Sequence, residues 1–270
     1  MINLMFCGNK KAYDGILISL ISILNHTKEP INVHILTADM HEIKPEYIPI
    51  TDYQISILND LLKSKNPENE IKLFDVTEIF KSELSETINM NTSYTPYIFL
   101  RLLIDKIDNF PEKVLYLDTD IVCYKDISEL YNINVENYEY AAAKDYLGIW
   151  FIDYKYINSG VLLINLKNVK ANDSFSACRE MCRNRKMLLP DQTALNKICK
   201  DKLYLPRKFN EQKERKADTV IRHFSMTIKL LPFEKINIKP WHIEKIHDVY
   251  KIHDFDDVLE KYSEIKEGMK

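Results

Sequence analysis

Along the first two thirds of the chain, the pattern of apolar and polar residues predicts strands that alternate with helices. Short continuous apolar runs predict buried strands, and residues 52–64 place Ile55, Leu58, Leu61 and Leu62 on one helical face. The expected strands are 2–7, 31–37, 71–76, 114–122, 140–144 and 161–166, and the expected helices are 12–25, 52–64, 96–107, 172–186 and 191–198. This order is typical of an α/β fold with a mostly parallel sheet, and the unbroken apolar strands indicate that both faces are covered.

The last third of the chain is more polar and predicts fewer regular elements. Residues 206–217 are dense in charge, and we expect a mobile loop there. A strand-like piece follows at 219–224, and a helix is expected over 255–266. We therefore expect a main domain over residues 1–240 and a C-terminal helical extension over 241–270 that packs on it.

Composition excludes several classes of protein. The 37 basic and 40 acidic side chains nearly balance, which argues against a nucleic-acid partner attracted by bulk charge. Only 5 glycines are present, and no Gly-rich phosphate loop of the Walker A or dinucleotide-binding type occurs, so a nucleotide must be held in another way. The apolar run at 1–7 lacks the features of a secretion signal, and no run is long enough to cross a bilayer.

The cysteines suggest a reducing compartment. Five are present at irregular spacing, which favours free thiols and a cytoplasmic location. Cys178 and Cys182 lie four residues apart on an expected helix, but no histidine or further cysteine accompanies them. Packing in the core therefore explains this pair better than metal binding does.

Two carboxylates follow directly on a buried strand. The apolar run that ends at Leu117 leads into Asp118-Thr119-Asp120. Side chains two residues apart on a strand share a face, so Asp118 and Asp120 are expected to converge. Ligands of open α/β sheets bind beyond the carboxyl ends of the strands, and paired carboxylates there suit a hard divalent cation that also holds a diphosphate. The alternative is an ordinary surface turn.

Further polar residues fall at the ends of other expected elements. Asp145 follows the strand at 140–144, Asn158-Ser159-Gly160 precedes the strand at 161, Asp191-Gln192 opens a helix, and His223 lies in the last strand-like piece. Each has a structural explanation, as a helix start, a turn or a packed histidine. Their occurrence together and in this order favours a functional explanation.

In this order, the blocks resemble glycosyltransferase family 8, which includes glycogenin and bacterial lipopolysaccharide galactosyl- and glucosyltransferases. The resemblance covers residues 4–24, 97–102, 117–120, 145, 158–166, 191–196, 223–224 and 239–242. It implies a GT-A nucleotide-diphospho-sugar transferase fold. It also implies a retaining hexosyltransferase that uses UDP-glucose or UDP-galactose and a metal, usually Mn²⁺, with Mg²⁺ as an alternative.

The resemblance also implies a role for each candidate residue. Asp118, Asp120 and His223 would ligate the metal, and Lys239 would reach the diphosphate. Asp191 would bind a sugar hydroxyl, and Gln192 would lie under the anomeric carbon. Arg101, Asp145 and Asn158, together with Asp118, would hold the donor or shape its pocket. Whether Gln192 acts as a nucleophile or only electrostatically is left open; an amide is a poor nucleophile, so attack by the acceptor from the same face is the simpler mechanism.

Two departures from the family pattern concern the nucleotide. Many members carry an acidic and an aromatic residue just after the first strand, where this chain has Gly-Asn-Lys-Lys-Ala-Tyr at 8–13. Asn9 can still form hydrogen bonds with a base edge. The segment between His223 and Lys239 is also long, so residues 225–238 are expected to form an extra excursion.

Two other classes of function are considered, and the acceptor stays open. A nucleotidyltransferase on a related fold would show an N-terminal Gly-rich loop with a basic residue, which residues 8–11 do not match. A non-catalytic sugar-nucleotide-binding domain would not need both the metal ligands and Asp191-Gln192. The acceptor is expected to be a glycan or a lipid-linked molecule, and peripheral contact with the inner face of the membrane and the oligomeric state are left open. The Lys-, Ile- and Asn-rich composition suggests a bacterial source.

Overall fold

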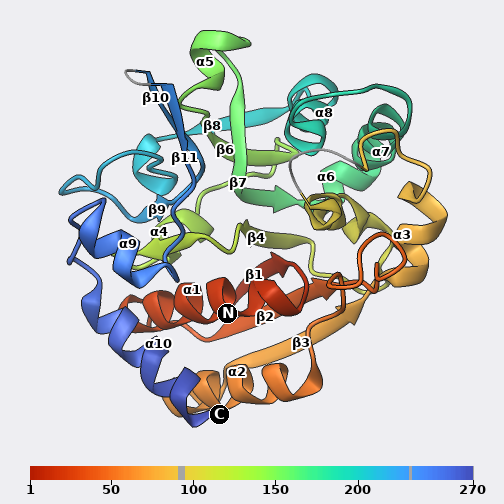
Figure 1. The fold of residues 1–270 in the computed structure, drawn as a ribbon. Helices are drawn as coiled ribbons and strands as arrows, with labels where there is room; N and C mark the ends of the chain where they lie inside the picture. The colour runs from red at the N-terminus through yellow and green to blue at the C-terminus, as the bar shows by residue number, and fades with distance from the viewer. Residues whose placement is uncertain (91–94, 231–232, 270) are drawn as a thin grey trace.

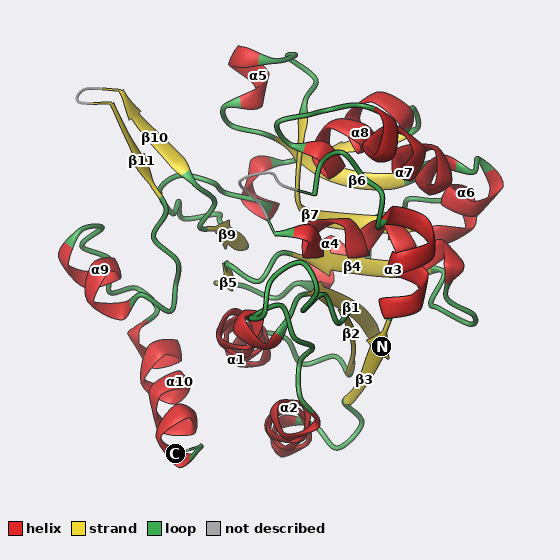
Figure 2. Cartoon of the chain, turned by 45° about the vertical axis from the view of Figure 1, so that its right-hand side comes forward, coloured by secondary structure: helices red, strands yellow, loops and turns green. Residues whose placement is uncertain are grey.

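A seven-stranded sheet with helices on both faces forms the centre of the molecule (Figures 1 and 2). The structure is a computed structural model and describes residues 1–90, 95–230 and 233–269. The strand order is β3-β2-β1-β4-β7-β6-β8. The strands are β1 (Ile2–Cys7), β2 (Ile31–Thr37), β3 (Glu70–Asp75), β4 (Lys113–Leu117), β6 (Tyr140–Lys144), β7 (Ile157–Asn165) and β8 (Lys202–Leu205).

Most strand pairs of the central sheet are parallel, as the sequence predicts. Strands β3, β2, β1 and β4 pair in parallel, and β6 pairs in parallel with β8. The exception is β7, which lies antiparallel between β4 and β6. Because β7 runs in the opposite direction, its first residues lie beside the carboxyl end of β4, and the backbone N–H of Asp118 donates to the carbonyl of Gly160 at 2.8 Å.

Alternate residues of the central strands point into two separate hydrophobic cores. In β4, Leu115 and Leu117 pack in the core that contains α1, whereas Val114 and Tyr116 pack in the core that contains η2. All four side chains are almost fully buried. The prediction that both faces of the sheet are covered is therefore confirmed, and the unbroken apolar runs follow from it.

The helices lie in two layers around this sheet. The first layer contains α1 (Tyr13–His26) and α2 (Asp52–Lys65), and α2 begins with a capping box between Thr51 and Gln54. The opposite layer contains α3 (Thr77–Leu84), the 3₁₀ helix η2 (Pro96–Lys106), α6 (Leu166–Ala171), α7 (Ser174–Asn184) and α8 (Pro190–Ile198). Shorter helices are η1 (Lys10–Ala12), α4 (Ser128–Tyr131), α5 (Gly148–Phe151) and η3 (Arg207–Phe209). The segment expected as an ordinary helix at 96–107 is thus a 3₁₀ helix.

The strand expected at 114–122 is divided by a turn. Strand β4 ends at Leu117, and β5 (Ile121–Cys123) leaves the central sheet to pair antiparallel with β9 (Ile221–His223). The turn contains both aspartates, and the register sets Ile121 opposite His223. A single strand over 114–122 was therefore the wrong expectation, and the pairing of β5 with β9 is what brings His223 to the aspartates.

Two other local expectations differ from the structure. Asn158-Ser159-Gly160 lies within β7 rather than before it. The segment 206–217 is not entirely a surface loop, because residues 209–212 are buried. The backbone N–H of His223 donates to the carbonyl of Glu211 at 2.9 Å, which attaches this polar stretch to β9.

The C-terminal part wraps back onto the first layer of helices. The segment 225–238 contains a hairpin of β10 (Thr227–Leu230) and β11 (Phe233–Ile236), as the expected excursion, while residues 231–232 lie outside the described residues. Helices α9 (Ile243–Asp248) and α10 (Asp256–Gly268) follow, and α10 packs beside α1 (Figure 1). The division of the chain at residue 240 stays a prediction. Among the described residues, no helix combines the length and apolar character needed to cross a membrane.

Candidate active site

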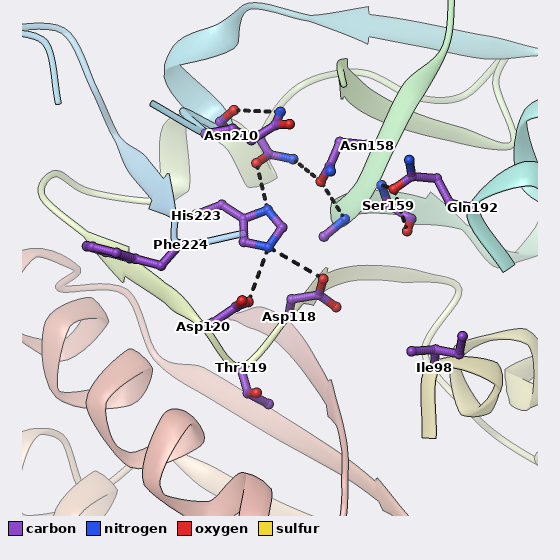
Figure 3. Close-up of polar contacts among 12 residues, drawn as sticks. Ile98, Asp118, Thr119, Asp120, Asn158, Ser159, Gln192, Asn210, His223 and Phe224 are labelled. Carbon is purple, nitrogen blue, oxygen red and sulfur yellow. Dashed lines mark hydrogen bonds and ion pairs between the residues drawn. The ribbon is translucent and has the colours of Figure 1, made fainter. Parts of the chain in front are cut away.

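Three candidate metal ligands converge at the turn after β4 (Figure 3). His223 Nε2 lies 3.1 Å from Asp120 Oδ1 and 3.6 Å from Asp118 Oδ2. One ligand atom from each of the three residues lies within 4.8 Å of the others. The imidazole comes from β9, which is far away in the sequence, so only the β5–β9 pairing explains the meeting.

A glycine makes room for the imidazole. A Cβ atom built on Gly160 would lie 2.2 Å from Cε1 and 2.7 Å from Nδ1 of His223, and 2.8 Å from Asp118 Oδ2. Real Cβ atoms do not approach other heavy atoms this closely, so no other residue fits without moving the histidine. The glycine of the Asn-Ser-Gly block therefore has a steric reason, which the sequence alone did not reveal.

A chain of amides fixes the other side of the histidine ring. His223 Nδ1 lies 3.1 Å from Asn210 Oδ1, and Asn210 Nδ2 donates to Asn158 Oδ1 at 2.9 Å. Asn158 Nδ2 donates in turn to Asp145 Oδ2 at 2.8 Å. Because Nδ1 is engaged, Nε2 is the atom presented to the aspartates (Figure 3).

Asn210 was not identified from the sequence. It lies in the charged stretch 206–217, where neighbouring polar residues give no sign that one of them is buried. Its side chain is fully buried in the structure. Asn210 reaches His223 only because this segment pairs with β9.

Arg101 connects the candidate metal site to the start of α8. Its Nη2 lies 3.0 Å from Asp118 Oδ1, its Nη1 donates to the Ser159 carbonyl at 2.7 Å, and its Nε lies 3.5 Å from Asp191 Oδ2. The guanidinium also stacks on the ring of Tyr116, 4.1 Å from the centroid. A buried arginine with two carboxylate partners keeps this dense group of charges compensated.

Asp191 and Gln192 are presented by the first turn of α8. Pro190 occupies the first helical position, which is a favourable place for a residue without an N–H. Gln192 Oε1 accepts the backbone N–H of Ser159 at 3.0 Å, and its Nε2 donates to Asp145 Oδ2 at 3.2 Å. Burial raises the pKa of the Asp191 carboxyl, and the positive charge of Arg101 opposes that rise.

Lys239 contacts the candidate metal ligands, whereas the Asn9 side chain forms a hydrogen bond with the backbone of η1. Lys239 Nζ lies 2.5 Å from Asp120 Oδ2 and donates to the Phe224 carbonyl at 2.9 Å. Asn9 Oδ1 accepts the backbone N–H of Lys11 at 3.0 Å and caps η1 just beyond β1. Of the sequence candidates, Asn9 alone has its described side-chain hydrogen bonds outside this network.

The electrostatics suit a strongly charged ligand. Burial acts to raise the pKa of the Asp120 carboxyl, but the charges of Lys239 and His223 hold it far below its usual range. Burial acts to lower the pKa of His223, and Asp120 reverses this so that the net pKa lies above its ordinary value. The negative charge of Asp120 therefore persists at neutral pH and attracts cations.

Comparisons with known proteins agree with this architecture. A family model described as glycosyl transferase family 8 matches residues 3–245. A glycosyltransferase of Haemophilus influenzae is 28% identical over 225 residues, covering 77% of this chain and 62% of that protein. The lipopolysaccharide glucosyltransferase WaaO of Escherichia coli K12 is 33% identical over 138 residues, covering 44% of this chain and 41% of that protein.

Solved structures share the fold at lower identity. The galactosyltransferase LgtC, in complex with donor and acceptor sugar analogues, has a TM-score of 0.69 at 17% identity, covering 98% of this chain and 95% of that one. An active-site variant of LgtC has a TM-score of 0.71 at 17% identity, covering 99% of this chain and 96% of that one. The fold expected from the sequence, a GT-A type with a mostly parallel sheet, is confirmed. Against the first curated relatives the chain spans less than two thirds of their length.

Proposed function

Because the chain belongs to glycosyl transferase family 8, we propose that it transfers glucose or galactose from a UDP-sugar with retention at the anomeric carbon. The acceptor in this proposal is a glycan or a lipid-linked glycan. The observation that carries the proposal is the convergence of Asp118, Asp120 and His223 at the sheet edge where α/β enzymes bind ligands.

The donor atoms at this point fit Mn²⁺, with Mg²⁺ as an alternative. Two carboxylates and one imidazole form a mixed oxygen and nitrogen set, which suits Mn²⁺ better than the all-oxygen preference of Ca²⁺. The three residues would leave other coordination positions for diphosphate oxygens. When bound, the metal supplies Lewis-acid stabilisation of the departing UDP.

The chain's own residues would bind and orient the donor. Lys239 reaches Asp120 at the edge of the metal site, from where its ammonium would pair with the diphosphate. Asn158 donates to Asp145, and Arg101 donates to Asp118. We assign Asp145, Asn158 and Arg101 to the donor sugar and the shape of its pocket. Asn9 remains our candidate for the base, although its carbonyl oxygen already caps η1.

Asp191 and Gln192 are proposed to act at the sugar. Asp191 would accept a hydrogen bond from a sugar hydroxyl, and the buried Arg101 beside it keeps the carboxylate in position. The Gln192 amide is oriented by Ser159 and Asp145, so its dipole is preorganised. We favour an electrostatic role under the anomeric carbon, with the acceptor attacking from the face that UDP leaves.

Two observations bear on the acceptor and the cellular location. The similarity to a lipopolysaccharide glucosyltransferase supports a lipid-linked acceptor. All five cysteines are free and buried, which supports our proposal of a reducing, cytoplasmic location in a bacterium. Neither observation favours a nucleotidyltransferase or a non-catalytic binding domain.

Donor binding tests the proposal without knowledge of the acceptor. UDP, UDP-glucose, UDP-galactose, UDP-N-acetylglucosamine and ADP-glucose are screened by thermal unfolding, each with and without Mn²⁺. We expect UDP and one of the two UDP-hexoses to raise Tm only when Mn²⁺ is present, because ligand binding to the folded state stabilises it. Asp120→Asn serves as the control and should lose the Mn²⁺-dependent part of the shift. An equal shift in this variant would contradict the assigned site.

A further inference from the structure

Four large apolar side chains stand in solvent on one short segment. We call residues 150–154 the aromatic lobe; in it Trp150 is 77% exposed, Phe151 74%, Ile152 54% and Tyr154 66%. The lobe includes the end of α5, which projects at the upper edge of the molecule (Figures 1 and 2). Adjacent exposed apolar residues of this size are uncommon on a soluble surface and mark a binding surface.

The aromatic lobe is attached to the candidate donor pocket through one carboxylate. Asp145 Oδ1 accepts the backbone N–H groups of Leu147 at 3.0 Å and Gly148 at 2.6 Å, which begin the turn that carries the lobe. The other oxygen, Oδ2, accepts from Asn158 and Gln192. One carboxylate therefore links the turn that carries the lobe to two of the candidate donor-site residues.

Cationic side chains border the lobe. Lys144 and Lys155 place their Nζ atoms 5.8 Å and 5.3 Å from the centroid of the Tyr154 ring. Lys213 lies 3.7 Å from the centroid of Tyr146, just before the lobe. The acidic residue of the lobe, Asp153, accepts the backbone N–H of Lys155 at 2.7 Å.

We propose that the aromatic lobe docks on the surface of an anionic lipid bilayer. Tryptophan and tyrosine favour the boundary between headgroups and acyl chains, and the bordering lysines are attracted by anionic headgroups. The combination of apolar side chains with a cationic border distinguishes this surface from a purely apolar contact between protein subunits. Docking would turn the donor pocket toward the membrane, where a lipid-linked acceptor is presented.

The inference does not depend on the proposed donor or reaction, so it is tested without nucleotide. Full-length protein is sedimented with vesicles of phosphatidylcholine alone or with about 30% phosphatidylglycerol. We expect binding to the anionic vesicles only, with a blue shift of tryptophan emission on binding. The shift should disappear in Trp150→Phe, which leaves Trp241 as the one tryptophan in the chain.

Matched variants separate the lobe from general surface hydrophobicity. The lobe variant carries Trp150→Ser, Phe151→Ser and Tyr154→Ser and should bind anionic vesicles at least about tenfold more weakly. The control variant carries Tyr53→Ser, Ile88→Ser and Val249→Ser, three exposed apolar residues elsewhere, and should bind like the wild type. Lys144→Gln with Lys155→Gln should weaken binding by about twenty-fivefold, since each lysine near an anionic surface contributes about fivefold.

Three outcomes would overturn the inference. The first is that the wild type does not sediment with either kind of vesicle. The second is that the lobe variant sediments with anionic vesicles as strongly as the wild type. The third is that the lobe is a self-association surface. In that case, sedimentation velocity shows a dimer for the wild type and a monomer for the lobe variant, and neither protein binds vesicles. Far-ultraviolet circular dichroism and Tm confirm that each variant is folded before its result is used.

Discussion

Replacing Gly160 with alanine is expected to displace His223 from the aspartates without altering a proposed metal ligand. The new methyl group would meet His223 Cε1 at 2.2 Å and Asp118 Oδ2 at 2.8 Å. The distance to Cε1 must grow by about 1.2–1.8 Å to reach the 3.4–4 Å of an ordinary van der Waals contact. Gly160 does not have a positive φ, so alanine adds no backbone strain and the effect arises from this collision.

The expected loss of Mn²⁺ affinity follows from the contacts of His223 that the movement breaks. Displacing the ring lengthens the 3.1 Å separation from Asp120 and disturbs the contact with Asn210. Loss of ligand positioning typically weakens metal binding by about 10- to 100-fold. Overpacking in a filled interior should also lower the free energy of unfolding by about 1–3 kcal/mol.

Mn²⁺ affinity is measured with UDP present, from the loss of the electron paramagnetic resonance signal of free Mn²⁺. Gly268→Ala is the matched control, because a Cβ there meets nothing within 4 Å. The control should keep wild-type affinity and stability. If Gly160→Ala binds Mn²⁺ as tightly as the wild type, His223 is not a ligand in the position described here.

Three further substitutions test other parts of the account. Asp120→Asn should leave the thermal unfolding temperature nearly unchanged but lower Mn²⁺-dependent turnover by more than about a hundredfold, and unchanged turnover at limiting Mn²⁺ would contradict the site. Gln192→Ala should lower kcat by about ten- to a hundredfold with a smaller rise in donor KM, while proton NMR still shows an α product; wild-type kcat would remove this residue from the mechanism. His34 is buried between Phe74 and Phe110, and burial lowers its pKa to about 4. As the pH falls, His34 therefore takes up a proton in the unfolded protein before it does so in the folded one. Acidification from about pH 6.5 to pH 4 should lower the free energy of unfolding by about 3 kcal/mol. In urea titrations, His34→Leu should remove this dependence of the free energy of unfolding on pH.

Much of the fold follows from local patterns in the sequence. The apolar strands at 2–7, 31–37 and 140–144 appear with the expected boundaries because both faces of each strand are buried. Strand β8 was not foreseen, because its residues are less buried and its pattern is weak. Helix α3 was also not foreseen, since its eight residues bury only Phe80 and Leu84.

The sequence predicted those residues of the candidate site that are close neighbours in the chain or that match a motif of the family. Asp118 and Asp120 could be paired from their spacing, but the turn between them could not, because it depends on β5 leaving the sheet for β9. Asn210 has no sequence signal of its own, since its burial arises from a long-range pairing. The closeness of Gly160 to the histidine is likewise a property of packing.

We propose that this chain breaks the bond between UDP and a hexose at a metal site formed by Asp118, Asp120 and His223. Phosphorus NMR can follow UDP-glucose and UDP-galactose incubated with the wild type and Mn²⁺, and with Asp120→Asn as the control. We expect signals of UDP from one of the two donors, dependent on Mn²⁺ and absent from the variant. Formation of pyrophosphate or of UMP with a sugar phosphate, or equal UDP release by the variant, would contradict it.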